Sequence, residues 1–370
     1  MDENCLYSKN LYNCANYIIR QEFISNGKYI QYSDMDKMLQ SSEPYKVLDR
    51  NWRSFFVAIK DWKENPSKYL GMPKLPNYKE KDGRFTWFIK NNSCYINDGV
   101  LHFKVKRLHG ITFPTRSKGR LICVRFVPKG GCYVMEIVTE VNIPDLSEQP
   151  MKRIAGIDLG VNNLATISNN IGQRPIIING RGIKAINQYY NKRNAAIRSE
   201  LKRRHDKHRC HKLDAITLKR NNQIKTFMHI TSRRIVQYCQ QNEIDTLVCG
   251  LNKEWKHEVN VGRTNNQKFY YIPYDLLISQ LAYKCKENGI RFIVTGEAYT
   301  SGTSFLDDEQ PDASSYNKSR RIKRGLFQSG KGLVNADVNG ACQIIKKVSS
   351  NAFMGYEVVA DLQPVILNVV

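Results

Sequence analysis

The order of hydrophobic and polar positions first sets apart the N-terminal stretch, residues 1–68. Apolar side chains recur there every three or four positions, which predicts amphipathic helices. The clearest stripe consists of Leu48, Trp52, Phe55, Phe56, Ile59 and Trp62. Such a stripe is typical of the core between packed helices, so we interpret these aromatic residues as core rather than as base-stacking groups.

Residues 69–150 have a different pattern, with short apolar runs between prolines and glycines. The runs that predict strands lie at residues 86–89, 100–105, 120–126 and 132–138. The intervening string Pro128-Lys129-Gly130-Gly131 predicts a hairpin turn between the last two runs. This pattern of short strands and turns favours a small antiparallel sheet or a β-barrel.

From residue 151 short strands alternate with long helical stretches, which favours a mixed or parallel α/β sheet. The predicted strands span residues 154–157, 164–167, 176–178, 244–249 and 290–295. The predicted helices span residues 181–241, 276–288 and 337–348. Residues 298–333 are polar and basic, and we expect them to be mobile.

The charge of the chain points to a polyanionic partner. The formal net charge is +23 over 370 residues, an excess that destabilises a compact chain by self-repulsion unless nucleic acid offsets it. No apolar run approaches the roughly 20 residues that span a bilayer, so we expect no membrane partner. The 10 cysteines show no CxxC spacing, which indicates reduced thiols in a cytoplasm and argues against a zinc ribbon.

Three acidic residues stand where an α/β sheet places its ligands. Asp158 ends a hydrophobic strand, Glu297 follows another, and Asp337 opens a helix. Carboxylates on rigid elements are the oxygen ligands that Mg²⁺ requires, and two such ions can activate water against a phosphodiester. A capping or turn role for each residue is the structural alternative.

Five strings resemble segments of the transposon-encoded TnpB proteins and the related type V CRISPR effectors. They are residues 8–13 (SKNLYN), 73–78 (PKLPNY), 157–166 (IDLGVNNLAT), 298–301 (AYTS) and 335–341 (NADVNGA). The string at 157–166 is similar to the first RuvC motif of that family, and the string at 335–341 is similar to the third.

The resemblance implies a fold and a function. It implies an α/β RNase H-like (RuvC) nuclease domain at residues 151–370, with a basic insertion at 298–333. An N-terminal helical recognition domain would occupy residues 1–68, and a small β-barrel, wedge-like domain residues 69–150. The family binds an RNA from its own mobile element and cuts DNA that pairs with this guide. The resemblance thus implies an RNA-guided DNA endonuclease of the bacterial cytoplasm, whose partners are guide RNA and target DNA.

The same resemblance assigns Asp158 and Asp337 as catalytic metal ligands, with two Mg²⁺ ions as cofactor, and we propose Glu297 as the third ligand. The family has its second-motif glutamate directly after the strand at 244–249, where this chain has Gly250. If the strand before Glu297 is a neighbour, it lies about 4.8 Å away and Glu297 can reach the same place. Glu254 and Glu258 are the competing donors. Because residues 298–333 contain no cysteine, we expect no zinc there.

Basic residues supply candidates for nucleic-acid binding in two stretches. They are Arg193, Arg198, Lys202, Arg203, Arg204, Lys207, Arg320, Arg321, Lys323 and Arg324. The first group would line a channel for a guide–target duplex and the second would hold the scissile strand, although a solvated helix or loop is the alternative for each. Two other functions stay open: a cleavage-deficient, RNA-guided repressor, which the loss of glutamate at position 250 favours, and a guide-independent nuclease that reads branched DNA.

Overall fold

The computed structural model describes residues 1–39, 43–143, 145–146, 150–205, 210–251, 272–354 and 362–369. It divides the chain into two compact units, Met1–Asn142 and Ile143–Val370, and each is described by itself. None of the helices in the described ranges is long and apolar enough to cross a membrane.

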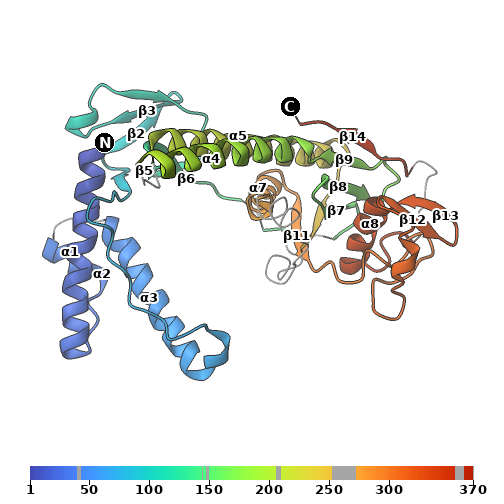
Figure 1. Ribbon diagram of the computed structural model, residues 1–370, viewed down its shortest axis with the longest axis horizontal. Coiled ribbons are helices and arrows are strands. Elements are labelled where there is room, and N and C mark those ends of the chain that lie inside the picture. The colour runs from blue at the N-terminus through green and yellow to red at the C-terminus, as the bar shows by residue number, and fades with distance from the viewer. Residues whose placement is uncertain are drawn as a thin grey trace. The chain divides into compact units, whose positions relative to one another are not determined.

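The first unit begins with helices that pack around an aromatic core (Figure 1). These are α1 (Asp2–Asn26), α2 (Tyr32–Leu39) and α3 (Glu43–Glu64), followed by a 3-10 turn at Pro66–Lys68. Leu48 and Trp52 of the predicted stripe are fully buried, and Phe55 and Phe56 pack against them. The interpretation of this stripe as helix core is confirmed for these four residues.

An extended segment after α3 runs along one face of α1 and is held there by side chains of the helix. The donors and the carbonyls that they bind are Ser8 to Thr86 (2.7 Å), Lys9 to Lys81 (2.7 Å), Asn13 to Lys79 (2.9 Å) and Asn16 to Pro76 (2.9 Å). Backbone groups of a segment without regular structure need such partners, because burial without hydrogen bonds is costly. Side chains of residues 8–16 thus hold the segment at residues 76–86 against α1.

The rest of the first unit consists of two three-stranded antiparallel sheets around one hydrophobic cluster. One contains β1 (Trp87–Lys90), β5 (Arg120–Lys129) and β6 (Cys132–Glu140), and the other contains β2 (Cys94–Asn97), β3 (Val100–Phe103) and β4 (Thr112–Pro114). The predicted hairpin turn is confirmed, because Lys129 pairs with Cys132 and both Gly130 and Gly131 have positive φ. A closed barrel stays a prediction.

The second unit is built on a six-stranded sheet with the order β11-β10-β7-β8-β9-β14. Its strands are β7 (Ile154–Leu159), β8 (Asn163–Asn169), β9 (Ile176–Asn179), β10 (Thr246–Gly250), β11 (Arg291–Thr295) and β14 (Val365–Leu367). The strands β7, β8 and β9 are antiparallel neighbours, whereas β10 and β11 run parallel to β7. The prediction that the strand before Glu297 neighbours the strand before Gly250 is confirmed.

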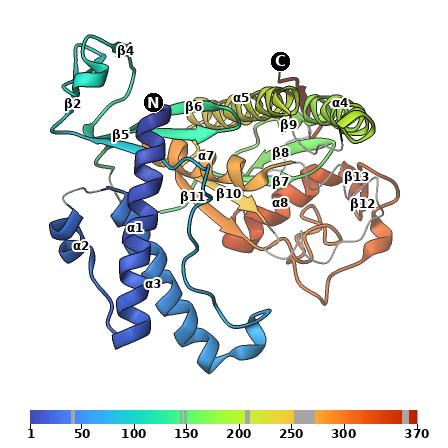
Figure 2. The same cartoon turned by 60° about the vertical axis from the view of Figure 1, so that its left-hand side comes forward.

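Helices cover both faces of this sheet (Figure 2). They are α4 (Arg181–His205), α5 (His211–Gln241), α7 (Tyr274–Glu287) and α8 (Ala336–Val348). The prediction that residues 181–241 are helical is confirmed for α4 and α5. These are separate helices, because Cys210 has an extended backbone and α5 starts after it and packs against α4. Apolar periodicity continues in both helices, so it could not reveal the interruption. On the other face, α8 lies so close to β7 that a Cβ at Gly156 would be 2.3 Å from the Ala341 carbonyl oxygen.

Residues 298–333 have a defined conformation, although we expected them to be mobile. They include a 3-10 turn at Lys318–Arg320 and the strand β12 (Leu326–Ser329), which forms a hairpin with β13 (Gly332–Asn335). Phe305, Phe327 and Val334 are buried against α8. The composition of the segment is polar on average, which concealed these few apolar anchors.

Candidate active site at the carboxyl end of the sheet

Asp158 lies near the carboxyl end of β7, on the face of the sheet that α8 covers. Residues alternate between faces along a strand, so Gly156 and Asp158 both point toward α8. The Asp158 carboxylate rests against the helix at Gly340, where an added Cβ would come within 2.8 Å of its Oδ2 atom. Glycine at position 340 therefore makes room for this carboxylate.

Glu297 occupies the space above Gly250. Cys249 pairs with Ile157, so the register of the parallel strands places Gly250 beside Asp158, on the same face of the sheet. A Cβ added to Gly250 would lie 2.8 Å from Glu297 Cγ and 3.0 Å from its Oε1. The Glu297 side chain thus fills the position that a longer residue at 250 would take, and it approaches from the end of the neighbouring strand β11.

Asp337 stands in the first turn of α8 and is oriented by two donors. Asn335 caps the helix, because its side chain accepts hydrogen bonds from the backbone N–H groups of Asp337 and Val338. The Asn163 amide donates to Asp337 Oδ2 at 2.7 Å, and the Arg321 guanidinium donates to Oδ1 at 3.3 Å. The carboxylate therefore has both a fixed helix position and a fixed rotamer.

Two carboxylates of the site, Asp158 and Glu297, have raised proton affinity. The pKa of Asp158 is raised well above its usual value, first because the group is buried and then because Glu297 and Asp337 are near, while Arg321 opposes the shift. Burial raises the pKa of Glu297 from 4.5 to about 7. The Coulombic effects on Asp158 show that the three carboxylates are near enough to influence one another.

The cluster has the donor set for a divalent cation, although its side chains do not converge as they stand. Among the described residues, no three His, Cys, Asp or Glu side chains are arranged to hold a metal ion. Two buried oxygens, Glu297 Oε1 and Thr166 Oγ1, have no hydrogen-bond partner in the described ranges. Thr166 pairs with Asp158 across β7 and β8. Hard oxygen atoms without hydrogen-bond partners, beside carboxylates that repel one another, fit a divalent cation, whose charge would offset the repulsion.

A cavity of about 400 Å³ opens beside these residues. Asp158 and Asp337 line it together with the arginines at positions 181, 321 and 324. Glu297 is not among the lining residues and lies behind Asp158, over Gly250. Arginines around buried carboxylates make a site that accepts a phosphate and a cation together.

Three residues at the site received no role from the sequence: Asn163, Thr166 and Arg181. Asn163 and Thr166 lie within the string at 157–166, so the motif itself pointed to them. Arg181 had no signal, because it opens a helix that the chain enters only after two further strands. Only the fold brings it to the cavity.

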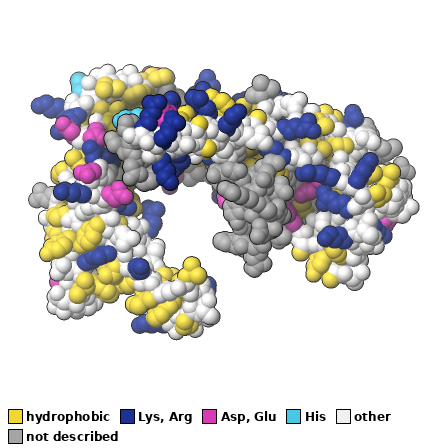
Figure 3. Space-filling model, in the orientation of Figure 1, with side chains coloured by type: hydrophobic (Ala, Val, Ile, Leu, Met, Phe, Trp, Pro, Cys, Tyr) yellow, Lys and Arg dark blue, Asp and Glu magenta, His cyan; other side chains and the backbone are white. Residues whose placement is uncertain are grey.

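The basic residues of the two stretches have different surroundings. Those of α4 are exposed at the surface, where Lys and Arg side chains gather along α4 and α5 (Figure 3). Arg321 and Arg324 line the cavity, and Lys323 is exposed near them. The guanidinium of Arg320 instead binds Glu309 at 2.7 Å. Lys207, Glu254 and Glu258 lie outside the described residues.

Two protein families match this chain. The family described as a probable transposase, OrfB of IS605, matches residues 134–256, and the Cas12f1-like TNB domain matches residues 274–344. Within these two ranges the chain is similar to the two families. The second match covers Glu297, Asp337 and the segment between them, and the first covers Asp158 and Gly250.

Two solved structures are similar to this chain at low sequence identity. A Cas12f1 protein solved with its guide RNA and target DNA has 16% identity and a TM-score of 0.38, over 93% of each chain. A CRISPR-Cas12f protein from a ternary complex has 14% identity and a TM-score of 0.41, over 92% of this chain and 80% of its own. No curated protein matches the chain.

Proposed function

We propose that this protein is an RNA-guided DNA endonuclease of a mobile element, with an RNase H-like (RuvC) active site at Asp158, Glu297 and Asp337. It would act in the bacterial cytoplasm with a guide RNA and a target DNA as partners. The main support is the Glu297 side chain, which lies above Gly250 and beside Asp158. This arrangement fits a branch of the TnpB family in which the second-motif glutamate has moved to the adjacent strand and the zinc cysteines are absent.

Asp158, Glu297 and Asp337 are the residues that would hold Mg²⁺, with two ions expected. When bound, the ions would supply a nucleophilic water and stabilise the charge on the scissile phosphate. Arg321 and Arg324 line the cavity and would bind phosphates of the strand to be cut. Arg181, the first residue of α4, also lines the cavity and would bind the same strand. Asn163 would keep Asp337 in the rotamer that the ions require.

The exposed basic residues of α4 would bind the sugar–phosphate backbone of the guide–target duplex. They are Arg193, Arg198, Lys202, Arg203 and Arg204. Base pairing, rather than protein contacts, would then supply sequence specificity. Binding through several phosphate contacts predicts an affinity that falls steeply with salt concentration.

The test is cleavage by the protein expressed with the DNA that flanks its gene. The purified complex would receive a matched DNA target and Mg²⁺, with wild type beside Asp158→Ala and Glu297→Gln. We expect wild type to cut and both variants to lose at least about 100-fold in rate while they still bind the target. If Glu297→Gln cuts as fast as wild type, Glu254 and Glu258 become the donors to test.

A cleavage-deficient, RNA-guided repressor is the second candidate. It is favoured by Gly250 at the glutamate position and by carboxylates that do not converge on one point. Wild type that binds the matched target and does not cut it with Mg²⁺ or Mn²⁺ would establish this alternative. Activity that survives removal of the RNA would instead support a guide-independent nuclease.

A further inference from the structure

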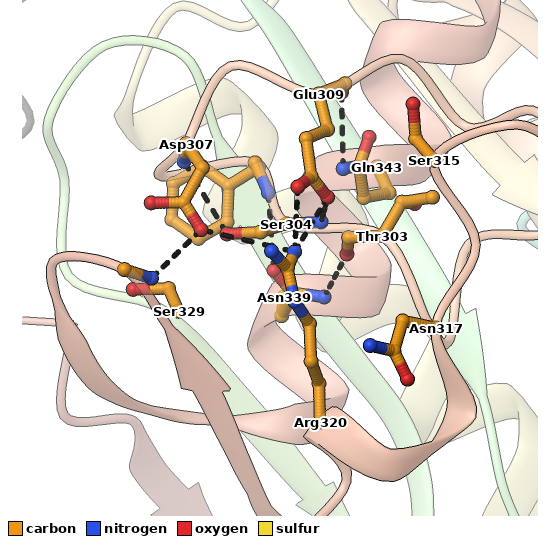
Figure 4. Close-up of polar contacts among 12 residues, drawn as sticks. Thr303, Ser304, Asp307, Glu309, Ser315, Asn317, Arg320, Ser329, Asn339 and Gln343 are labelled. Carbon is orange, nitrogen blue, oxygen red and sulfur yellow. Dashed lines mark hydrogen bonds and ion pairs between the residues drawn. The ribbon is translucent and has the colours of Figure 1, made fainter.

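The segment between Glu297 and Asp337 is joined to α8 by a polar network whose centre is an ion pair (Figure 4). Arg320 Nη1 donates to both carboxylate oxygens of Glu309, each at 2.7 Å, and lies 3.8 Å from Asp307 Oδ2. The side chains of Arg320 and Glu309 are only 27% and 21% exposed. An ion pair this shielded is screened less than a surface pair, so it can fix a chain segment.

Glu309 is itself fixed to α8. Its backbone carbonyl accepts a hydrogen bond from the Gln343 side chain at 3.2 Å, and its carboxylate accepts one from the Ser304 N–H at 2.8 Å. One turn earlier on the helix, the fully buried Asn339 donates to the Thr303 carbonyl and accepts from the Phe305 N–H. Residues 303–309 are therefore attached to the polar side of α8 by side chains that face away from the sheet.

Arg321, the residue after Arg320, also contacts α8. Arg321 binds Asp337 in the first turn of α8. The contacts thus run from α8 through Glu309 to Arg320, and from Arg321 to the carboxylate at the active site. Two adjacent arginines have separate partners, one in the network and one at the site.

We propose that Arg320 is a positioning residue: its ion pair with Glu309 holds the segment at residues 318–325 so that Arg321 stays on Asp337 beside the cavity. The importance of Arg321 for the reaction rests on the proposed function, whereas the anchoring itself does not. Residues 298–333 contain no cysteine, so no disulfide or zinc–cysteine site can restrain this segment. In our proposal the ion pair between Arg320 and Glu309 restrains it instead. Arg320 does not touch the substrate in this scheme.

Hydrogen exchange measured by mass spectrometry on the full-length protein tests the anchoring without any cleavage. Arg320→Ala should raise exchange at residues 303–309 and 318–325 by about tenfold while α8 and the central sheet keep wild-type protection. Arg320→Lys should give an intermediate effect, because it keeps the charge and loses the forked geometry. Lys318→Ala, a neighbouring exposed cation in the same turn, is the matched control and should leave exchange unchanged. Unchanged exchange in Arg320→Ala would overturn the proposal, and so would loss of protection throughout α8.

Binding of Mn²⁺ alone tests the link to Arg321. A cation at Asp337 repels a metal ion, so Arg321→Ala should bind Mn²⁺ about fivefold more tightly than wild type. If Arg320 acts through Arg321, then Arg320→Ala should also bind more tightly, and the double variant should bind no more tightly than Arg321→Ala. A merely structural defect would weaken binding instead, and additive effects would overturn the proposal. Failure of the proposed function would appear separately, as Mn²⁺ binding that Asp158→Asn does not change.

Discussion

Two regions of this protein, one in each unit, differ in how their buried polar groups are paired. In the first unit, Lys9 and Asn16 are almost completely buried in α1, and each side chain donates to a backbone carbonyl of the extended segment that lies along the helix. In the second unit, Asp158 and Glu297 are half-buried at the end of the sheet and the pKa of each is raised, and one Glu297 oxygen has no partner in the described ranges. The first arrangement stabilises a fold, whereas the second raises the energy of its own ionised form.

This difference separates structural polar groups from functional ones. A buried polar group with a partner offsets its desolvation, whereas a buried carboxylate without one takes up a proton or attracts a cation. The polar network around Arg320 and Glu309 belongs to the first kind, although it lies on the helix that contains Asp337. The candidate active site is therefore distinguished by carboxylates whose pKa is raised, rather than by polarity alone.

The largest effect is expected from filling the space above Gly250, which Glu297 occupies. In Gly250→Ala the new methyl group would lie 2.5 Å from Ile344 Cδ1 and 2.8 Å from Glu297 Cγ, so Glu297 must move away from Asp158. We expect cleavage to fall about 100-fold, because a catalytic group displaced by an ångström loses that much. Gly296→Ala is the matched control, since a Cβ there meets nothing within 4 Å. Rates would be measured on the guided complex, with thermal melting to verify folding. Equal rates in both variants would show that Glu297 has no part in the reaction.

A smaller but direct effect concerns stability in the absence of metal. Glu297 has its pKa raised from 4.5 to about 7 in the folded state, so the folded protein binds more protons than the unfolded chain between these values. Its stabilising contribution is complete below pH 4.5 and is lost as the pH rises through 7. Glu297→Gln keeps the neutral form at every pH. We therefore expect it to match wild type near pH 4.5 and to be more stable by about 3 kcal/mol at pH 8.

Urea denaturation in the presence of a chelator measures this difference at each pH. Added Mg²⁺ should restore stability to wild type above pH 7 and have less effect on Glu297→Gln, since the variant lacks one ligand. A pH profile that is the same for wild type and variant would place Glu297 in water, contrary to its burial.

The sequence predicted the elements well where their patterns are local and missed what depends on contacts across the fold. The strands around Asp158 and Gly250, the start of α8 and the stripe at Trp52 follow from periodicity and motif. The different partners of Arg320 and Arg321 could not be predicted in this way, because two adjacent arginines look equivalent in the sequence. Only the fold shows that Arg320 binds Glu309 and that Arg321 binds Asp337. Arg181 illustrates the same limit, since its place at the cavity results from a chain path through two further strands.

The smallest expected effect concerns the hydrogen-bonded polar groups of the first unit and their contribution to stability. Asn16 is fully buried, donates to the Pro76 carbonyl at 2.9 Å and accepts from the Trp52 indole N–H at 3.1 Å. Asn16→Ala leaves the buried Trp52 indole N–H without this acceptor, whereas the Pro76 carbonyl keeps its hydrogen bond from Arg20 at 2.6 Å, so we expect the free energy of unfolding to fall by about 2 kcal/mol. Asn10→Ala, at an exposed position of the same helix, should change it by less than about 0.5 kcal/mol. Both values come from urea denaturation, and the Asn16 effect should not vary with pH because neither partner titrates. A loss that depends on pH, or that equals the Asn10 value, would mean that these hydrogen bonds do not hold the extended segment to α1.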